Sequence, residues 1–368
     1  MDYQDDFRNR DLAGGLIERI HSLAGDLGTV KLMEVCGSHT MAICRYGIRQ
    51  LLPENLMLLS GPGCPVCVTP GNYIDKAVAL ARLPDVIVTT FGDMFRVPGS
   101  TSSLENEKAN GAAVEVVFSP MDSVEMARDN PAKRVVFLGI GFETTIPAVA
   151  VAIKEAHSQG LRNHFVLCGH KTMPNALEAL VEGGTQVNGF ICPGHVSAII
   201  GTRPYEFLSQ QHGIGCVITG FEPLDIVQGI HMLLAQIADG IPAAENQYTR
   251  LVRPEGNKVG QAMIAEVFDP ADVEWRGLGV IPESGLRIKE EFAASDAERN
   301  IEFTPEPTVE KKGCRCGDIL QGIKTPEDCP LFGIHCTPTA PVGPCMVSNE
   351  GCCAAAYKYT ERPLGTTD

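Results

Sequence analysis

Apolar residues recur at helical spacing over residues 12–27, and a short apolar run follows over residues 30–35. The first pattern ends at a glycine and predicts an amphipathic helix, whereas the second predicts a buried strand. The strand leads through a polar turn into another apolar periodic segment, residues 41–52, which we expect to be a helix capped by Ser38 or Thr40. A strand, a turn and a helix in this order are typical of α/β folds.

The same alternation of strands and helices continues to about residue 240. Because alternating β and α elements predict mainly parallel sheets, we expect the α/β fold class. The turn-prone sequence Asp-Asn-Pro at residues 129–131 divides the run into two similar layered domains, residues 1–130 and 131–240. Proline and glycine then become frequent, and residues 241–368 are expected to form a cysteine-rich domain. Further strands are predicted within residues 56–61, 85–92, 134–138, 165–170 and 187–195, and further helices over residues 73–82, 146–157 and 175–182.

Composition and charge narrow the class of partner. The chain has 368 residues, of which 44% are hydrophobic and 20% charged, so it is long enough for two or three domains with ordinary cores. Its net charge of −15 and the lack of a dense basic stripe argue against nucleic-acid binding. The acidic N-terminus is unlike a secretory signal, and no apolar segment is long enough to cross a bilayer. We therefore expect a cytoplasmic protein that does not contact a membrane.

Cysteines carry most of the functional information in this chain. In a reducing compartment, 14 cysteines are more typical of metal or redox chemistry than of a disulfide framework. They include two separate groups, and thiolates are both soft metal ligands and redox groups. The sequence therefore indicates a protein that handles iron, moves electrons, or does both. The N-terminal group is Cys36, Cys64 and Cys67, and the C-terminal group is Cys314, Cys316, Cys329, Cys336, Cys345, Cys352 and Cys353.

Cys36 is the first candidate site residue, because it lies where a strand is expected to end and a helix to begin. Backbone amides and the helix dipole at such a turn favour a thiolate, and His39 follows three residues later. The pair is a candidate metal ligand or nucleophile with a neighbouring imidazole. The alternative is a buried structural cysteine with a surface histidine.

Cys64 and Cys67 form a CxxC motif in the loop GPGCPVC, directly before a predicted helix. This spacing suits either a dithiol–disulfide couple or two ligands of one metal ion. The alternative is half of a zinc site, which Cys36 and His39 would complete. Such a closed four-ligand site would have a structural role, because it leaves no open coordination position.

The cysteines of the tail are irregularly spaced and match neither ferredoxin runs nor paired zinc knuckles. They still offer the four thiolate ligands of a [4Fe–4S] cluster, with cysteines left over for a nearby redox pair. A zinc site is the alternative. The candidate cluster ligands are Cys316, Cys329, Cys336, Cys345 and Cys352.

The segment GIGFETT follows a predicted strand, as a dinucleotide-binding loop would, but it lacks the third glycine and the later acidic residue. We do not expect a nicotinamide cofactor. Glu143, Thr144 and Thr145 are instead expected to face a cleft, as are Cys192 and His195 of the CPGH segment. A histidine such as His195, taken alone, is more typical of the protein interior than of a metal site.

Four segments together resemble the HypD family of hydrogenase maturation proteins over nearly the whole chain. They are CGSHTMAICRYGIRQLLPENLMLLSGPGCPVCVTP, GFETT, PGH and PEDCPLFGIHCTPTAPVGPCMVSNEGCC. The resemblance implies two α/β domains followed by an iron–sulfur domain. It also implies a scaffold that works with the small partner HypC to assemble the Fe(CN)2CO unit destined for the large subunit of nickel–iron hydrogenases. Cyanide would come from HypE after HypF prepares its carbamoyl precursor, so the protein would be an assembly factor more than a turnover enzyme.

The resemblance also assigns roles to individual residues. It places the iron on Cys36, shared with a cysteine of HypC, and His39 beside it. Cys64 and Cys67 would be further iron-site groups or a thiol pair that exchanges electrons with the tail. Met41 stands where many relatives have a second histidine, which removes a base at that position. The tail would hold a [4Fe–4S] cluster on Cys329, Cys336 and Cys352, with Cys316 or Cys345 as the fourth ligand.

Two functions of other classes remain open. One is a free-standing iron–sulfur disulfide reductase, in which Cys64 and Cys67 turn over and Cys36 is dispensable. The other is a zinc-stabilised binding module without redox chemistry.

Overall fold

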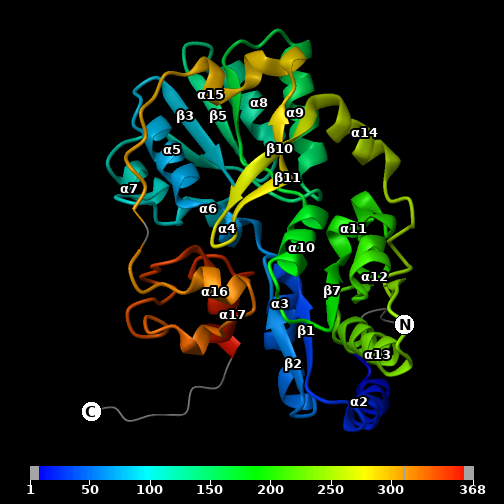
Figure 1. Cartoon of the computed structure of the whole chain (residues 1–368). Helices are drawn as coiled ribbons and strands as arrows, with labels where there is room; N and C mark the ends of the chain where they lie inside the picture. Colours follow the sequence, from blue (N-terminus) through cyan, green and yellow to red (C-terminus); the bar gives the residue numbers. More distant parts are fainter. Residues whose placement is uncertain (1–7, 310, 360–368) are drawn as a thin grey trace.

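A computed structural model describes residues 8–309 and 311–359 of the chain. Two parallel sheets form its framework, one with strand order β2-β1-β7-β8-β9 and the other with order β4-β3-β5-β6 (Figure 1). The predicted α/β class with mainly parallel layers is therefore confirmed. The strands are β1 (Val30–Glu34), β2 (Leu56–Ser60), β3 (Val86–Thr90), β4 (Val114–Val116), β5 (Arg134–Gly139), β6 (His164–Cys168), β7 (Gly189–Pro193), β8 (Gly215–Thr219) and β9 (Ala244–Asn246).

The order of the strands differs from the predicted division of the chain. β1 and β2 pair with strands from the middle of the sequence, and Leu32 of β1 lies opposite Gly189 of β7. The other sheet is inserted between the two parts of this first sheet. The expected boundary near residue 130 therefore falls inside the inserted sheet, between β4 and β5 of the chain. The hydrophobic pattern locates each strand, but pairing depends on contacts between distant segments, which that pattern does not encode.

Helices cover both sheets. In the first layer, Ile20, Leu32, Ile43 and Ile230 pack into one core between α2, β1, α3 and α13. The second layer is covered in the same way by helices that follow its strands. The helices are α2 (Arg10–Gly25), α3 (Gly37–Arg45), α4 (Pro65–Val68), α5 (Gly71–Ala81), α6 (Gly92–Phe95), α7 (Leu104–Ala109), α8 (Pro120–Asp129), α9 (Ile146–Ser158), α10 (Met173–Glu182), α11 (Gly194–Ile200), α12 (Glu206–His212), α13 (Pro223–Asp239), α14 (Lys258–Val267), α15 (Ala297–Asn300), α16 (Cys316–Leu320) and α17 (Cys352–Tyr359).

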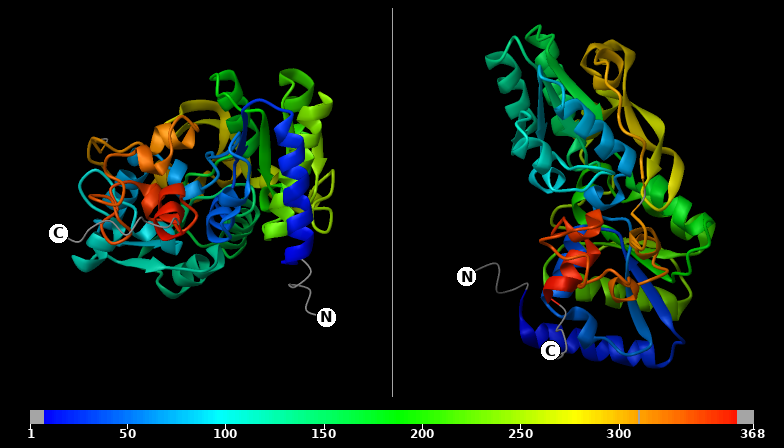
Figure 2. Two further views of the ribbon diagram at one scale, coloured as in Figure 1. Left: turned by 90° about the horizontal axis from the view of Figure 1, so that it is seen from below. Right: turned by 90° about the vertical axis from the view of Figure 1, so that its left-hand side faces the viewer.

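The segment after β9 is more structured than its composition indicates. It contains α14 and an antiparallel hairpin, β10 (Phe268–Trp275) and β11 (Gly279–Ile288), before the cysteine-rich tail. The tail, orange to red in Figure 2, lies beside α3 and the first strands of the chain, and α17 contacts α3. Its cysteines share one buried core with residues of both sheets. The tail is therefore packed against the two α/β layers and is not an appendage.

The helix after β1 begins earlier than predicted. It starts at Gly37 with Cys36 as its N-cap, and neither Ser38 nor Thr40 caps it. Both hydroxyl groups have other partners, because Ser38 donates to Glu350 at 2.6 Å and Thr40 donates to Glu34 at 2.5 Å. The consequence is that Cys36, and not a residue with a hydroxyl group, occupies the N-cap position of the helix.

No helix within residues 8–309 and 311–359 combines the length and the apolar character needed to span a bilayer.

Candidate functional site

A cleft of about 410 Å³ lies where strands of both sheets end. The turns after β1, β3, β5 and β7 all contribute to its wall, because the carboxyl ends of parallel strands lie on the same edge of a sheet. The tail closes one side. The chemically reactive residues among those that line it are Cys36, Ser38, Asp93, Thr144, Thr145, His195, Ser348 and Glu350.

Cys36 lies in this cleft with 9% of its surface exposed. Burial raises the pKa of its thiol to about 12, and the negative charge of Glu350 acts in the same direction. The backbone N–H groups of His39 and Ser38 oppose this shift, because they favour a thiolate. A free thiolate is therefore disfavoured, and a bound cation would supply the missing stabilisation. This environment suits a metal ligand better than a free nucleophile.

His39 is fully buried and is not one of the residues that line the cleft. Its Nε2 lies 3.0 Å from the carbonyl oxygen of Gly220 and 2.8 Å from the hydroxyl oxygen of Thr219. Burial lowers the pKa of His39 to about 4, so the ring is neutral. Because a carbonyl oxygen only accepts, the proton lies on Nε2, and Nδ1 finds no hydrogen-bond partner within the described residues.

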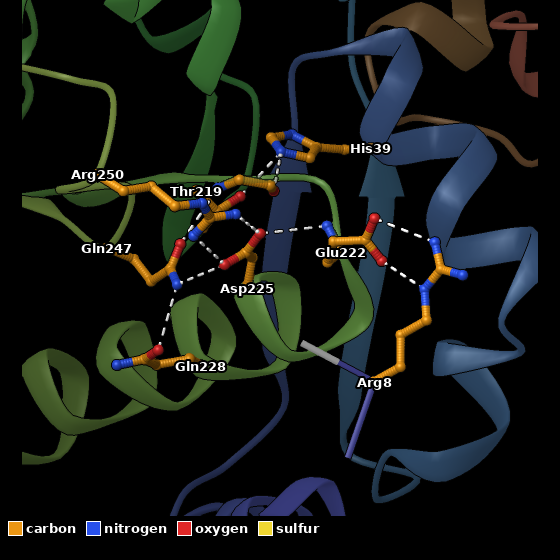
Figure 3. Close-up of polar contacts among 9 residues, drawn as sticks. Arg8, His39, Thr219, Glu222, Asp225, Gln228, Gln247 and Arg250 are labelled. Carbon is orange, nitrogen blue, oxygen red and sulfur yellow. Dashed lines mark hydrogen bonds and ion pairs between the residues drawn. The ribbon is translucent and has the colours of Figure 1, made fainter. Parts of the chain in front are cut away.

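A polar network fixes the peptide that faces His39 (Figure 3). The N–H group of Gly220 donates to Gln247 at 3.1 Å, and the side-chain amide of Gln247 donates to Asp225 at 2.9 Å. Arg250 forms a two-point ion pair with the buried Asp225, with donor–acceptor distances of 2.8 and 2.5 Å. A bidentate pair of this kind restricts orientation as well as adding energy. The carbonyl group of Gly220 is therefore held toward His39 by groups on a separate loop.

His195, which resembled an interior histidine in the sequence, lies on the cleft wall and is exposed. Its ring lies tilted against Phe221 with a centroid distance of 4.2 Å, and His39 stacks on the same phenyl ring at 4.7 Å. Partial burial lowers the pKa of His195, and the charge of Glu350 opposes this shift. The histidine that faces a ligand in the cleft is thus His195, while His39 supports the wall behind it.

The CxxC loop packs directly against the turn at Cys36. Gly37 donates to the carbonyl oxygen of Gly63 at 3.1 Å, and a Cβ atom on Gly63 would lie 2.1 Å from the backbone nitrogen of Cys36. Only glycine permits this approach of two backbones. The sulfur atoms of Cys64 and Cys67 are 2.6 Å apart and are buried behind this contact, outside the cleft. The structure therefore brings the three N-terminal cysteines into one region without pointing all of them at one ligand.

Contacts between sulfur atoms connect the CxxC pair to the tail. Burial raises the pKa of Cys67, but hydrogen bonds from Cys345 and Cys64 outweigh it, and the pKa is lowered. Cys345 also contacts Cys316 and Cys352. Thiols in contact in this way can exchange disulfide bonds or electrons. Cys67 therefore lies in contact with Cys345, a thiol of the tail.

A second cavity lies inside the tail. Its wall combines cysteine side chains with apolar groups from Ile319, Leu331, Phe332 and Met346. Several thiols within apolar walls fit the donor set and low polarity of an iron–sulfur cluster. No three His, Cys, Asp or Glu side chains in residues 8–309 and 311–359 converge on a ready-made site for a single metal ion, whereas a four-iron cluster spreads its ligands more widely. The cysteines on the wall are Cys314, Cys316, Cys329, Cys336 and Cys353.

The sequence-based ligand set and the cavity overlap only in part. Cys345 and Cys352 were candidate cluster ligands, but they lie toward Cys67 and are not on the cavity wall. Cys314 and Cys353 are on the wall although the sequence did not single them out. The sequence also missed Glu350. Its bond to Ser38 spans 312 positions, and no local spacing signals such a contact.

Glu143 does not face the cleft as expected, although Thr144 and Thr145 do. Its carboxyl group is 4% exposed and accepts a hydrogen bond from the backbone of Met173 at 2.9 Å. Cys192 is likewise buried in β7. Burial raises the pKa of Glu143 to about 7. Glu143 therefore holds the β5 loop against α10 as a buried, partly protonated acid.

The titration of Glu143 predicts a measurable pH dependence of stability. The folded protein keeps a proton on this carboxyl group up to a pKa of about 7, whereas the unfolded chain releases it near 4.5. The stabilising contribution is complete below pH 4.5 and is lost as the pH rises to about 7, with a slope of up to about 1.4 kcal/mol per pH unit. Urea unfolding of Glu143→Gln between pH 5 and pH 8 should show a flatter profile than wild type. The exposed control Glu182→Gln should keep the wild-type slope, and parallel profiles for Glu143→Gln and wild type would contradict the assignment.

Comparison with known proteins gives consistent results. A family model named HypD, described as "Hydrogenase formation hypA family", matches residues 11–360. The chain is 48% identical over 367 residues to the hydrogenase expression/formation protein HupD of Azotobacter chroococcum, covering 98% of this chain and 97% of that protein. It is 46% identical over 368 residues to the hydrogenase maturation factor HypD of Cupriavidus necator, with the same coverage of 98% and 97%. It is 47% identical over 367 residues to the factor of the same description in Azotobacter vinelandii, again with 98% and 97% covered.

Proposed function

The chain belongs to the HypD family of hydrogenase maturation factors, and from this premise we propose that it is the scaffold on which iron receives cyanide and carbon monoxide. The iron is the cargo, and the product is the Fe(CN)2CO unit of nickel–iron hydrogenases. The small protein HypC would share the iron, and HypE would supply the cyanide. The observation that carries this proposal is the position of Cys36, the cysteine among the residues that line the cleft.

Cys36 would hold the iron through its sulfur atom. Iron(II) with cyanide and carbon monoxide ligands suits a soft thiolate, and the thiol must lose its proton when the metal binds. Glu350 is the carboxylate whose charge acts most strongly on the Cys36 thiol, and its bond to Ser38 fixes it on the cleft wall. Glu350 therefore lies near the Cys36 thiol on the wall of the same cleft. His195, exposed in the same cleft, would donate a hydrogen bond to a cyanide nitrogen.

The tail cavity would hold the [4Fe–4S] cluster on Cys329, Cys336 and Cys353, with Cys314 or Cys316 as the fourth ligand. When bound, such a cluster supplies electrons one at a time. The sulfur contacts from Cys316 through Cys345 to Cys67 would connect the cavity to the CxxC pair. Cys64 and Cys67 would then alternate between a dithiol and a disulfide beside the Cys36 turn. This differs from the sequence-based set, which placed Cys352 on the cluster.

An infrared spectrum tests the proposal. The protein is purified anaerobically together with HypC, and the region of metal-bound cyanide and carbon monoxide stretches is recorded. Bands that shift on ¹³C-cyanide labelling of the precursor are expected. Iron and acid-labile sulfide analysis of the same sample establishes whether the cluster is present. If the partner and the cluster are both present and no bands appear, the scaffold proposal is wrong.

The disulfide reductase is the second candidate, because the sulfur atoms of Cys64 and Cys67 lie in contact and reach the tail thiols through Cys345. It differs from the scaffold in a directly observable way. A reductase turns over a disulfide substrate in the absence of HypC and does so equally well without the Cys36 thiol.

A further inference from the structure

A separate hollow, of about 280 Å³, opens where the tip of the β10–β11 hairpin meets α16. Three basic side chains line it, from Arg276, Lys311 and Arg315. Two thiol groups, from Cys314 and Cys316, lie among them. We name this feature the basic hollow. Nothing in the assembly of iron ligands at Cys36 accounts for it.

The charge of the basic hollow is opposite to that of the protein. The chain as a whole carries −15, and yet Lys312 is exposed next to the hollow in the sequence and Lys324 lies at its edge. Asp318 is the one carboxylate among the described residues that line it. That carboxylate is already shared between Lys324 at 3.2 Å and Arg315 at 3.7 Å. The face around α16 is therefore locally positive.

The basic hollow is separated from the cysteine cavity of the tail by very little protein. Cys314, Cys316 and Gly343 line both spaces. The sulfur atoms of Cys314 and Cys316 are 3.4 Å apart, and Cys314 is partly exposed. A Cβ atom on Gly343 would lie 2.8 Å from one sulfur and 2.9 Å from the other. A group bound in the hollow thus reaches the outer side of the thiols that line the cavity.

Arg276 is held in place by the segment that follows the CxxC pair. Its backbone N–H donates to Val68 at 2.8 Å, and its Nε donates to the carbonyl oxygen of Thr69 at 2.9 Å. Its Nη2 is buried without a hydrogen-bond partner within residues 8–309 and 311–359. The bonds to Val68 and Thr69 fix the position of the Arg276 side chain on the wall of the hollow, where its positive charge adds to those of Lys311 and Arg315.

We propose that the basic hollow is the docking site of an acidic one-electron carrier protein, which delivers electrons to the cluster of the tail. The inference rests on the proposed function, because it requires that cluster. A protein is favoured over a small anion because the positive charge extends past the hollow to Lys312 and Lys324, and an extended field of one sign steers protein partners. Ile323, 66% exposed beside Lys324, offers the apolar contact that protein interfaces combine with a charged rim.

The electrons balance as follows. Each docked carrier would give up one electron to the cluster that the tail cysteines would hold, and would leave oxidised by one electron. Two such transfers, together with two protons from solvent, convert one disulfide bond between Cys64 and Cys67 into two thiols. The carrier is consumed as a one-electron reductant and is not bonded to the protein.

The test uses the full-length protein with its cluster and a reduced acidic [2Fe–2S] ferredoxin as the probe. The double variant Lys312→Glu/Arg315→Glu reverses two charges beside the hollow. The control Arg253→Glu/Lys258→Glu reverses one arginine and one lysine that are exposed elsewhere, so the change in net charge is the same. At low salt, the rate constant for ferredoxin oxidation should fall about tenfold or more in the first variant and change less than about twofold in the control. The difference should narrow as salt is added.

Calorimetry measures the binding of oxidised ferredoxin, which does not depend on electron transfer. Binding should be weakened in Lys312→Glu/Arg315→Glu and nearly unchanged in Arg253→Glu/Lys258→Glu. Equal losses in both double variants, or rates that do not respond to salt, would overturn the docking site. The docking site would also be overturned if millimolar inorganic phosphate fully inhibited ferredoxin oxidation by wild type without changing ferredoxin binding. That result would indicate a site for small anions. Photochemical reduction of the cluster with a deazaflavin should be the same in all samples. A sample without iron and labile sulfide would instead count against the proposed function.

Discussion

Replacing Cys36 with alanine should remove every cyanide and carbon monoxide band from the infrared spectrum of the protein with HypC. The reason is that Cys36 supplies the soft ligand of the cleft, and alanine leaves no atom that can hold iron there. The fold should tolerate the change, because the turn is fixed by the backbone bond from Gly37 to Gly63 at 3.1 Å and not by the thiol. Iron and labile sulfide belonging to the tail should stay at the wild-type level.

Cys44→Ala is the matched control for this variant. Cys44 lies on the same helix, α3, and is partly buried, but its sulfur contacts Arg49 at 3.8 Å and does not reach the cleft. The infrared bands of the Cys44→Ala protein should be the same as those of wild type. Persistence of the bands in Cys36→Ala would move the iron to Cys64 and Cys67, and loss of the tail cluster in that variant would show that the two sites are not independent.

The elements of this fold could be predicted because their signals are local. The apolar run over residues 30–35 became β1 (Val30–Glu34), and the periodic segment over residues 146–157 became α9 (Ile146–Ser158). The pairing of β1 with β7 could not be predicted in this way. It depends on Leu32 pairing with Gly189, and in the sequence all four strands of the inserted sheet lie between these two residues.

The candidate site likewise has features that the sequence predicts and features that it does not. The turn at Cys36 follows from a strand that ends before a helix, and the CxxC spacing follows from the sequence itself. The sequence does not predict that His195 lines the cleft while His39 is buried. His195 lines the cleft and His39 does not, and both rings contact Phe221, which follows a different strand, β8.

Neighbouring cysteines show a further limit of sequence spacing. Cys352 and Cys353 open α17, and successive residues of a helix point about 100° apart. Only one of these two cysteines can therefore face the cavity. Their distances along the chain to the other cysteines of the tail differ by a single residue, so the spacing does not show which one it is. Cys353 lies on the cavity wall, whereas Cys352 is hydrogen-bonded to Cys345.

The Cys353→Ala protein should consequently lose the iron and acid-labile sulfide of the tail, whereas Cys352→Ala should keep both. Removing one of the four thiolate ligands leaves one iron atom of the cluster without a protein ligand, because alanine supplies no donor atom. The cluster is then exposed to solvent and is easily lost. Cys352→Ala removes a thiol on the side of Cys67, so its effect should appear as slower reduction of the CxxC pair. Iron, labile sulfide and the visible absorption of anaerobic samples measure the first effect, and the rate of thiol labelling at Cys64 and Cys67 measures the second.

Cys329→Ala and Cys345→Ala extend the comparison to the rest of the tail. Cys329 lies on the cavity wall, and its variant should behave as Cys353→Ala does, while Cys345→Ala should resemble Cys352→Ala. The opposite result for the adjacent pair, with the cluster lost in Cys352→Ala and retained in Cys353→Ala, would restore the ligand set derived from the sequence.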